Sequence, residues 1–203
     1  MLFRSGFAEE DRSRQPSVFS VLRRIIAKFA TPEDDKLGLW GAFGYDLAFQ
    51  FDSVDFKLPR PDDQRDLVLY FPDEIVVVDH HRAAATVYSY DFVVEGRLTV
   101  GLPRDGEPQP FKKADRDPGR GDHQPGEYAA SVGKAVEYFK RGDLFEVVPG
   151  QVFYEKPSSP PSAIARRLQQ INPAPFGFMF NLGASEYLIG ASPEMFVRVT
   201  NGK

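Results

Sequence analysis

The chain of 203 residues contains no cysteine. That absence excludes disulfide bonds, thiolate zinc ligands and a cysteine nucleophile, and it fits a reducing compartment. Long apolar runs are also missing: no segment approaches the ~20 residues that cross a bilayer, and the N-terminal residues lack the apolar core of a signal peptide. Positive charge is scarce, because 25 lysines and arginines face 29 acidic residues and leave a net charge of −4. The composition therefore predicts a globular, cytoplasmic protein with neither a membrane nor a nucleic-acid partner.

Several common functional motifs are absent as well. Gly38, Gly41 and Gly44 do not have the spacing of a dinucleotide-binding loop, and no phosphate-binding lysine motif occurs. No serine lies in a Gly-x-Ser-x-Gly turn, which argues against a serine hydrolase. His80 and His81 are adjacent, so on a strand they would point to opposite faces and could not share a metal ion.

Hydrophobic spacing predicts a mixture of helices and strands. Residues 17–30 carry apolar side chains at helical intervals after Ser17, which can cap the helix. Gly142 is placed to stop a second helix over residues 127–141. The other predicted elements are a helix that opens at Ser159-Pro160 and ends before Pro173, a strand and short helix in residues 37–51, and strands over residues 67–71, 75–79, 84–90, 144–153, 176–182, 187–190 and 195–200.

Residues 103–126 differ in composition from the segments on either side. Proline, glycine and charged residues dominate there, and Phe111 is the only large apolar side chain. Such a segment buries too little apolar surface to offset its ordering entropy. We therefore expect an exposed, protease-sensitive connector between an N-terminal region, residues 1–102, and the start of a second domain, residues 127–203.

The last residues carry a hairpin signal. Asn201-Gly202 follows the β-branched residues Val197, Val199 and Thr200, and Asn-Gly is a preferred two-residue turn between antiparallel strands. The turn predicts a returning strand, yet the sequence stops at Lys203. We therefore expect the chain to be a fragment that is cut inside a sheet.

Two glutamates are candidate functional residues. Glu146 alternates in phase with Leu144 and Val148, so a strand with an apolar inner face would carry its carboxylate inward. A buried carboxylate is costly unless it is paired or bound, which favours a functional role. Glu194 follows Pro193 between two predicted strands, where proline interrupts the ladder. The competing interpretation for both glutamates is a solvated acid at a strand edge.

Five motifs occur in sequence along most of the chain: GAFGYDLAFQF, DEIVVVDHH, RGDLFEVVPGQVF, NPAPFGFMF and LIGASPEMFVRV. Together they resemble the chorismate-utilising enzymes, and most closely anthranilate synthase component I. The resemblance implies an α+β fold with mostly antiparallel sheets that pack against each other and are flanked by helices. It also implies that the C-terminal half of the fold is missing, including the glutamates that bind Mg²⁺, which are expected beyond Lys203.

The implied activity is that of a Mg²⁺-dependent lyase that converts chorismate and ammonia into anthranilate and pyruvate in tryptophan biosynthesis. A glutamine amidotransferase, either a separate subunit or a fused domain, would supply the ammonia. The resemblance makes Glu194 the general acid for the departing hydroxyl. It places Glu146 where relatives use lysine or glutamine to position the nucleophile. Without the magnesium ligands, the chain alone is expected to be inactive.

Feedback inhibition by tryptophan is a further implication of the resemblance. The tryptophan-binding residues that it implies are Asn172, Pro173, Pro175, Phe176 and Gly177. Many relatives carry tyrosine and methionine at the last two of these positions.

Two alternatives remain open on the sequence. One is a sister enzyme of the same family that makes aminodeoxychorismate or isochorismate. The other is a non-catalytic module that senses tryptophan or docks an amidotransferase.

Overall fold

The computed structural model describes residues 8–12, 14–51, 54–56, 59–104, 106–107, 110–112 and 119–200. The chain divides into two compact units. Unit 1 comprises Met1–Gly106 and Phe180–Glu186, and unit 2 comprises Glu107–Met179 and Tyr187–Lys203. The Asn201-Gly202 turn lies outside the described residues, so the returning hairpin stays a prediction.

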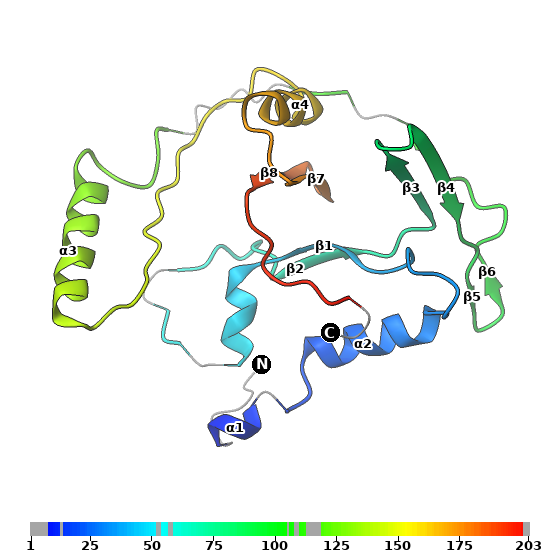
Figure 1. Ribbon diagram of the computed structural model, residues 1–203, viewed down its shortest axis with the longest axis horizontal. Helices are drawn as coiled ribbons and strands as arrows, with labels where there is room; N and C mark the ends of the chain where they lie inside the picture. The colour runs from blue at the N-terminus through cyan, green and yellow to red at the C-terminus, as the bar shows by residue number, and fades with distance from the viewer. Residues whose placement is uncertain are drawn as a thin grey trace. The chain divides into compact units, whose positions relative to one another are not determined.

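Unit 1 begins with the short helix α1 (Glu9–Arg12) and the helix α2 (Val18–Phe29), both drawn in blue in Figure 1. The bounds of α2 confirm the predicted helix, with Ser17 as N-cap and Ala30 as C-cap. The Ser17 N–H donates to Ser20 Oγ at 3.1 Å, which satisfies a backbone donor that a helix start leaves open.

Aromatic rings attach α2 to the rest of unit 1. The ring of Phe19 lies 5.7 Å from that of Phe43 between centroids. The ring of Phe29 lies 4.9 Å from Phe71 and 5.5 Å from Phe92. These edge and tilted contacts fit the preferred geometry of aromatic pairs, so they explain why the amphipathic face of α2 is fixed on the strands.

Two predicted strands pair in a short sheet after α2. Strand β1 (Trp40–Phe43) pairs antiparallel with β2 (Leu67–Tyr70), and the 3₁₀ helix η1 (Tyr45–Gln50) lies between them in sequence. Gly41 has a φ of +158°, and an added Cβ would lie 2.0 Å from the Val68 carbonyl oxygen. Only glycine therefore permits this close strand pairing.

A second pair of strands confirms two predicted strands, residues 75–79 and 84–90, and forms a hairpin. Strand β3 (Glu74–Asp79) pairs antiparallel with β4 (Ala84–Ser89). Asp79 Oδ1 accepts hydrogen bonds from the His81 and Arg82 N–H groups at 2.9 and 3.0 Å, so the histidines lie in a turn. A small hairpin of β5 (Val93–Val94) and β6 (Arg97–Leu98) follows.

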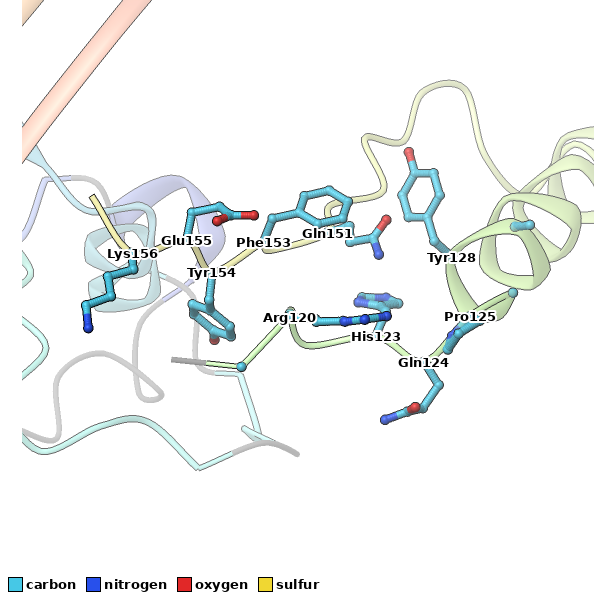
Figure 2. A pocket seen from close by; sticks show the side chains of 14 residues that line it. Arg120, His123, Gln124, Pro125, Tyr128, Gln151, Phe153, Tyr154, Glu155 and Lys156 are labelled. Atoms are coloured by element: carbon cyan, nitrogen blue, oxygen red, sulfur yellow. The ribbon is translucent and has the colours of Figure 1, made fainter. Parts of the chain in front are cut away.

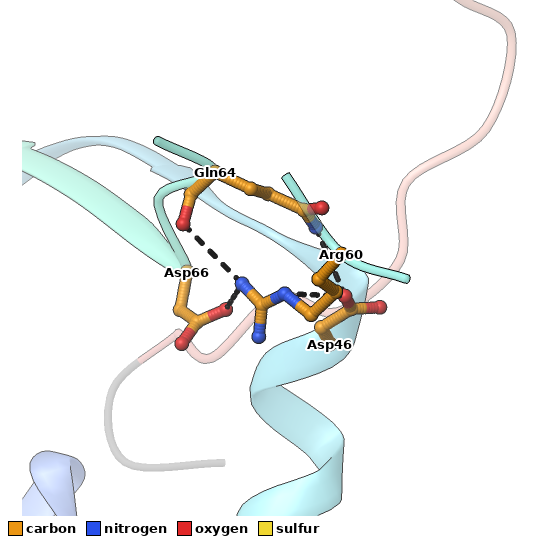
Figure 3. A network of polar contacts seen from close by, with 4 residues as sticks. All are labelled: Asp46, Arg60, Gln64 and Asp66. Carbon is orange, nitrogen blue, oxygen red and sulfur yellow. Dashed lines mark hydrogen bonds and ion pairs between the residues drawn. The ribbon is translucent and has the colours of Figure 1, made fainter. Parts of the chain in front are cut away.

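One arginine holds the loop before β2 (Figure 3). Arg60 Nη2 lies 2.6 Å from Asp66 Oδ1 and donates to the Gln64 carbonyl oxygen at 3.3 Å. Its Nε lies 3.3 Å from Asp46 Oδ2, which also accepts from Gln64 Nε2 at 2.9 Å. The guanidinium thereby connects η1 with the approach to β2.

Unit 2 contains the helices α3 (Glu127–Arg141) and α4 (Pro161–Ile171). Gly142 ends α3 with a φ of +80°, as the sequence predicted. Strands β7 (Phe176–Gly183) and β8 (Glu186–Ser192) form a hairpin, and both confirm predicted strands (Figure 1).

The tip of the β7–β8 hairpin, Phe180–Glu186, belongs to unit 1. Tyr70 donates its hydroxyl hydrogen to the Asn181 carbonyl oxygen at 2.5 Å. Arg65 pairs with Glu186 and donates from Nη1 to the Leu182 carbonyl oxygen at 2.6 Å. Two side chains, Arg65 and Tyr70, thus hold the hairpin tip by two hydrogen bonds to its backbone and one ion pair to Glu186.

Two predicted strands are wrong. Residues 144–153 contain only an isolated bridge, between Phe153 and Gly121, and residues 195–200 contain no strand. A strand is stable only when its N–H and C=O groups pair with a neighbour, and the described residues provide no such ladder for either segment.

The α+β class is confirmed, with helices and antiparallel pairs in one chain. The sheets are smaller than the resemblance implies, because all four in the described residues have two strands. Leu47 and Leu182 are the only buried apolar side chains among those residues, since a two-stranded sheet covers little surface. No helix in the described ranges is both long and apolar enough to span a membrane.

Candidate functional site

A cavity of about 460 Å³ in unit 2 brings α4 together with β7 and β8. Its walls come from one face of α4, the turn that follows this helix, the start of β7 and the end of β8. The lining residues are Ser162, Ala165, Arg166, Leu168, Gln169, Asn172, Ala174, Pro175, Gly177, Phe178, Met179, Gly190 and Ala191.

The polar side of this cavity is built by α4. Ser162, Arg166 and Gln169 follow one another at intervals of four and three residues, so they lie on one helix face. The Asn172 N–H donates to the Leu168 carbonyl oxygen at 2.8 Å and closes the last turn. The cavity therefore presents a guanidinium, two amides and a hydroxyl along a single line.

Another face of α4 is mainly apolar, although Arg167 also lies on it. Ile164, Leu168 and Ile171 line a second hollow of about 350 Å³ together with Ile189 of β8. Leu168 also lines the α4 cavity, so it borders both hollows.

The β7–β8 hairpin supplies the apolar wall. A Cβ added to Gly190 would lie 2.3 Å from Cζ of Phe178, so the ring crosses β8 directly over the glycine. Phe178 and Met179 both line the cavity. An aromatic ring and a thioether can thus cover the apolar part of a ligand.

Three of the five predicted effector residues lie in this cavity. Asn172, Pro175 and Gly177 line it, whereas Pro173 and Phe176 do not. Phe176 is 42% exposed, and its role in tryptophan binding stays a prediction.

The predicted site residues do not include the polar residues of α4, which are Ser162, Arg166 and Gln169. Their regular spacing beside Asn172 is the signal that could have identified them.

The two candidate catalytic glutamates are exposed. Glu146 lies in an extended segment without strand pairing, so its expected position on an inward strand face is not observed. Glu194 lies in a bend after Pro193, and its carbonyl oxygen accepts from Ser192 Oγ at 2.8 Å. Neither glutamate lines the α4 cavity, and their catalytic roles stay predictions.

A magnesium ion does not fit the described residues. In the ranges that the structure describes, no three histidine or acidic side chains are close enough to hold a metal ion. Mg²⁺ prefers several oxygen ligands in octahedral geometry, which the described side chains do not provide.

The chain belongs to the chorismate binding enzyme family, whose pattern matches residues 5–203. This match covers almost the whole sequence. It confirms the class to which the five motifs pointed.

Within this class, the chain is 50% identical to anthranilate synthase from Azospirillum brasilense over 96% of its length. It is 33% identical to anthranilate synthase component 1 from Cereibacter sphaeroides over 80%, and 29% identical to that from Serratia marcescens over 96%. The chain spans 26%, 36% and 39% of these relatives, respectively. No solved structure gives a significant match.

Proposed function

We propose that this chain is part of the chorismate-binding subunit of an anthranilate synthase, a cytoplasmic lyase of tryptophan biosynthesis. The observation that carries the proposal is the 50% identity to the Azospirillum brasilense anthranilate synthase, which extends over 96% of this chain. The relatives at 33% and 29% identity both carry the name anthranilate synthase component 1.

The reaction joins chorismate and ammonia and gives anthranilate, pyruvate and water. Ammonia forms a C–N bond at C2 of the ring, and the C4 hydroxyl leaves as water. Loss of the enolpyruvyl group as pyruvate, with one ring proton, then produces the aromatic ring. A glutamine amidotransferase partner is the proposed source of ammonia.

Glu194 is the residue of this chain that we assign to the hydroxyl departure. Hydroxide is a poor leaving group, so a positioned acid must deliver a proton as the C–O bond breaks. Pro193 restricts the backbone before Glu194, and the Ser192 hydroxyl holds its carbonyl at 2.8 Å. Glu146 is proposed to hold ammonia near C2 by a hydrogen bond.

The α4 cavity is the proposed tryptophan site. Its volume of about 460 Å³ falls within the range of small-molecule pockets. Asn172, Pro175 and Gly177 line it beside Arg166, which can pair with a carboxylate. Occupancy of this site is proposed to produce feedback inhibition.

Product analysis on the intact protein tests the proposed activity. With chorismate, glutamine and Mg²⁺, we expect fluorescent anthranilate and an equal amount of pyruvate. Aminodeoxychorismate or isochorismate in place of anthranilate would identify a sister enzyme. Tryptophan binding without any chorismate turnover would identify a non-catalytic sensor.

A further inference from the structure

A cavity larger than the two hollows beside α4 lies at the start of α3. It measures about 1300 Å³, and its lining comes from residues 119–129 and 151–156. It shares no lining residue with the α4 cavity, so the proposed tryptophan site does not account for it.

Backbone hydrogen bonds hold the two walls together. The Tyr154 N–H donates to the Arg120 carbonyl oxygen at 3.1 Å, and the Asp122 N–H donates to the Val152 carbonyl oxygen at 3.2 Å. A Cβ added to Gly121 would lie 2.5 Å from the Val152 oxygen, so glycine permits this close approach. This part of the expected connector is therefore anchored rather than free.

An acid fixes the histidine in the cavity. Asp122 Oδ1 lies 2.6 Å from His123 Nδ1 and also accepts from the Val152 N–H at 2.9 Å. The hydrogen bond from His123, followed by that from Val152, lowers the pKa of Asp122 below its usual value. Because the hydrogen bond to Asp122 occupies Nδ1, the ring orientation of His123 is fixed and Nε2 is the ring nitrogen left for other contacts.

Three polar groups converge on the middle of this cavity. Figure 2 shows the Arg120 guanidinium beside the His123 ring, with the Gln151 amide facing both from the other wall. Arg120 forms no ion pair within the described part of the chain, although Asp122 is two residues away. A guanidinium without a carboxylate partner can offer its planar fork to a ligand.

Aromatic rings border these polar groups. Figure 2 shows Tyr128 and Phe153 on the side of Gln151. The Tyr128 and His123 rings meet edge to face, with centroids 6.3 Å apart. Such rings favour a planar, apolar body rather than a bare inorganic ion.

We infer that this cavity binds a small organic anion in which a carboxylate is attached to a planar ring. The carboxylate would accept hydrogen bonds from the Arg120 guanidinium and the Gln151 side-chain amide, and the ring would lie against Tyr128 and Phe153. Asp122 and Glu155 balance the charges of Arg120 and Lys156 around this cavity, but the Asp122 carboxylate is already engaged by His123 and the Val152 N–H, so the Arg120 guanidinium is the charged group that can receive an anion.

Benzoate is a suitable probe, and hydrogen exchange on the intact protein reports where it binds. We expect saturable protection of peptides that cover residues 119–130 and 150–156. Arg120→Gln should weaken benzoate binding by at least about tenfold, because a hydrogen bond to a charged group is lost. Arg120 is exposed, so this substitution is not expected to disturb folding.

Arg82→Gln is the matched control, because Arg82 is 84% exposed in the β3–β4 turn. It should leave benzoate binding unchanged. Benzamide, which lacks the charge, should give little protection, and inorganic phosphate, which lacks the ring, should bind more weakly than benzoate. No protection of these peptides, or equal loss in both arginine variants, would overturn the inference. Anthranilate formation is measured separately, so either proposal can fail alone.

Discussion

The Tyr70 hydroxyl donates a 2.5 Å hydrogen bond to the Asn181 carbonyl oxygen and thereby joins residues 111 positions apart. Tyr70→Phe removes this bond and leaves the ring. We expect a loss of roughly 0.5–1.5 kcal/mol in local stability and faster amide exchange in residues 180–186. Tyr45→Phe is the control, because Tyr45 is 85% exposed. Equal amide exchange rates of residues 180–186 in both variants would show that the Tyr70 hydrogen bond does not stabilise the hairpin tip.

The Arg60 network should contribute to the stability of unit 1. Arg60→Gln breaks the contacts to Asp46 and Asp66, and because the groups are partly exposed we expect a cost of only about 1 kcal/mol. Arg60→Lys keeps the charge but loses the forked geometry, so it should recover part of this cost. Urea unfolding measures both, with Arg97→Gln as a control on the exposed strand β6.

Alkaline pH should destabilise unit 1 through Tyr90. Burial, with a further contribution from Asp34, raises the pKa of Tyr90 to about 12, and its hydroxyl has no hydrogen-bond partner of standard geometry in the described residues. The folded-state pKa exceeds the unfolded value, so this contribution to stability is complete below pH 10 and is lost as the pH rises towards 12.

Tyr90→Phe should remove this component of the alkaline transition. Thermal unfolding at a series of pH values provides the measurement. Tyrosinate absorbance should also show one fewer late-titrating group in Tyr90→Phe than in the parent protein. An unchanged pH profile would mean that Tyr90 titrates normally in the folded state.

Glu194→Gln tests the proposed general acid in the intact protein. The amide keeps the shape but cannot donate a carboxylic proton, so turnover should fall by about 10²–10⁴-fold while chorismate binding stays near normal. Glu137→Gln, on the exposed surface of α3, should retain full activity. A Glu194→Gln enzyme within a few-fold of the parent would reduce Glu194 to a structural role.

Asn172 and Phe176 should differ in their effect on tryptophan inhibition. Asn172 lines the α4 cavity and Phe176 does not. Asn172→Ala should raise the inhibition constant by roughly 2–10-fold, since a hydrogen bond is lost, and Phe176→Ala should raise it less. Uninhibited chorismate turnover, measured in parallel, should stay near normal in both variants. The opposite order would place the effector outside this cavity.

Local sequence patterns were sufficient to predict the helices α2, α3 and α4. The apolar periodicity of α2, the capping residue Ser17 and the stop at Gly142 are all set within one or two turns of chain. The β3–β4 hairpin was predictable for the same reason, because its strands are separated by a short turn.

The sequence by itself therefore determined the α+β class, the approximate bounds of α2, α3 and α4 and, through its five motifs, the family. It did not predict the short helix α1. The tertiary structure alone decided that residues 144–153 lack a strand, because a ladder depends on a partner distant in sequence. It also decided which polar residues share a cavity. Arg166 joins Asn172 and Gly190, and Arg120 joins Gln151, since residues far apart in the chain become neighbours only when their elements pack.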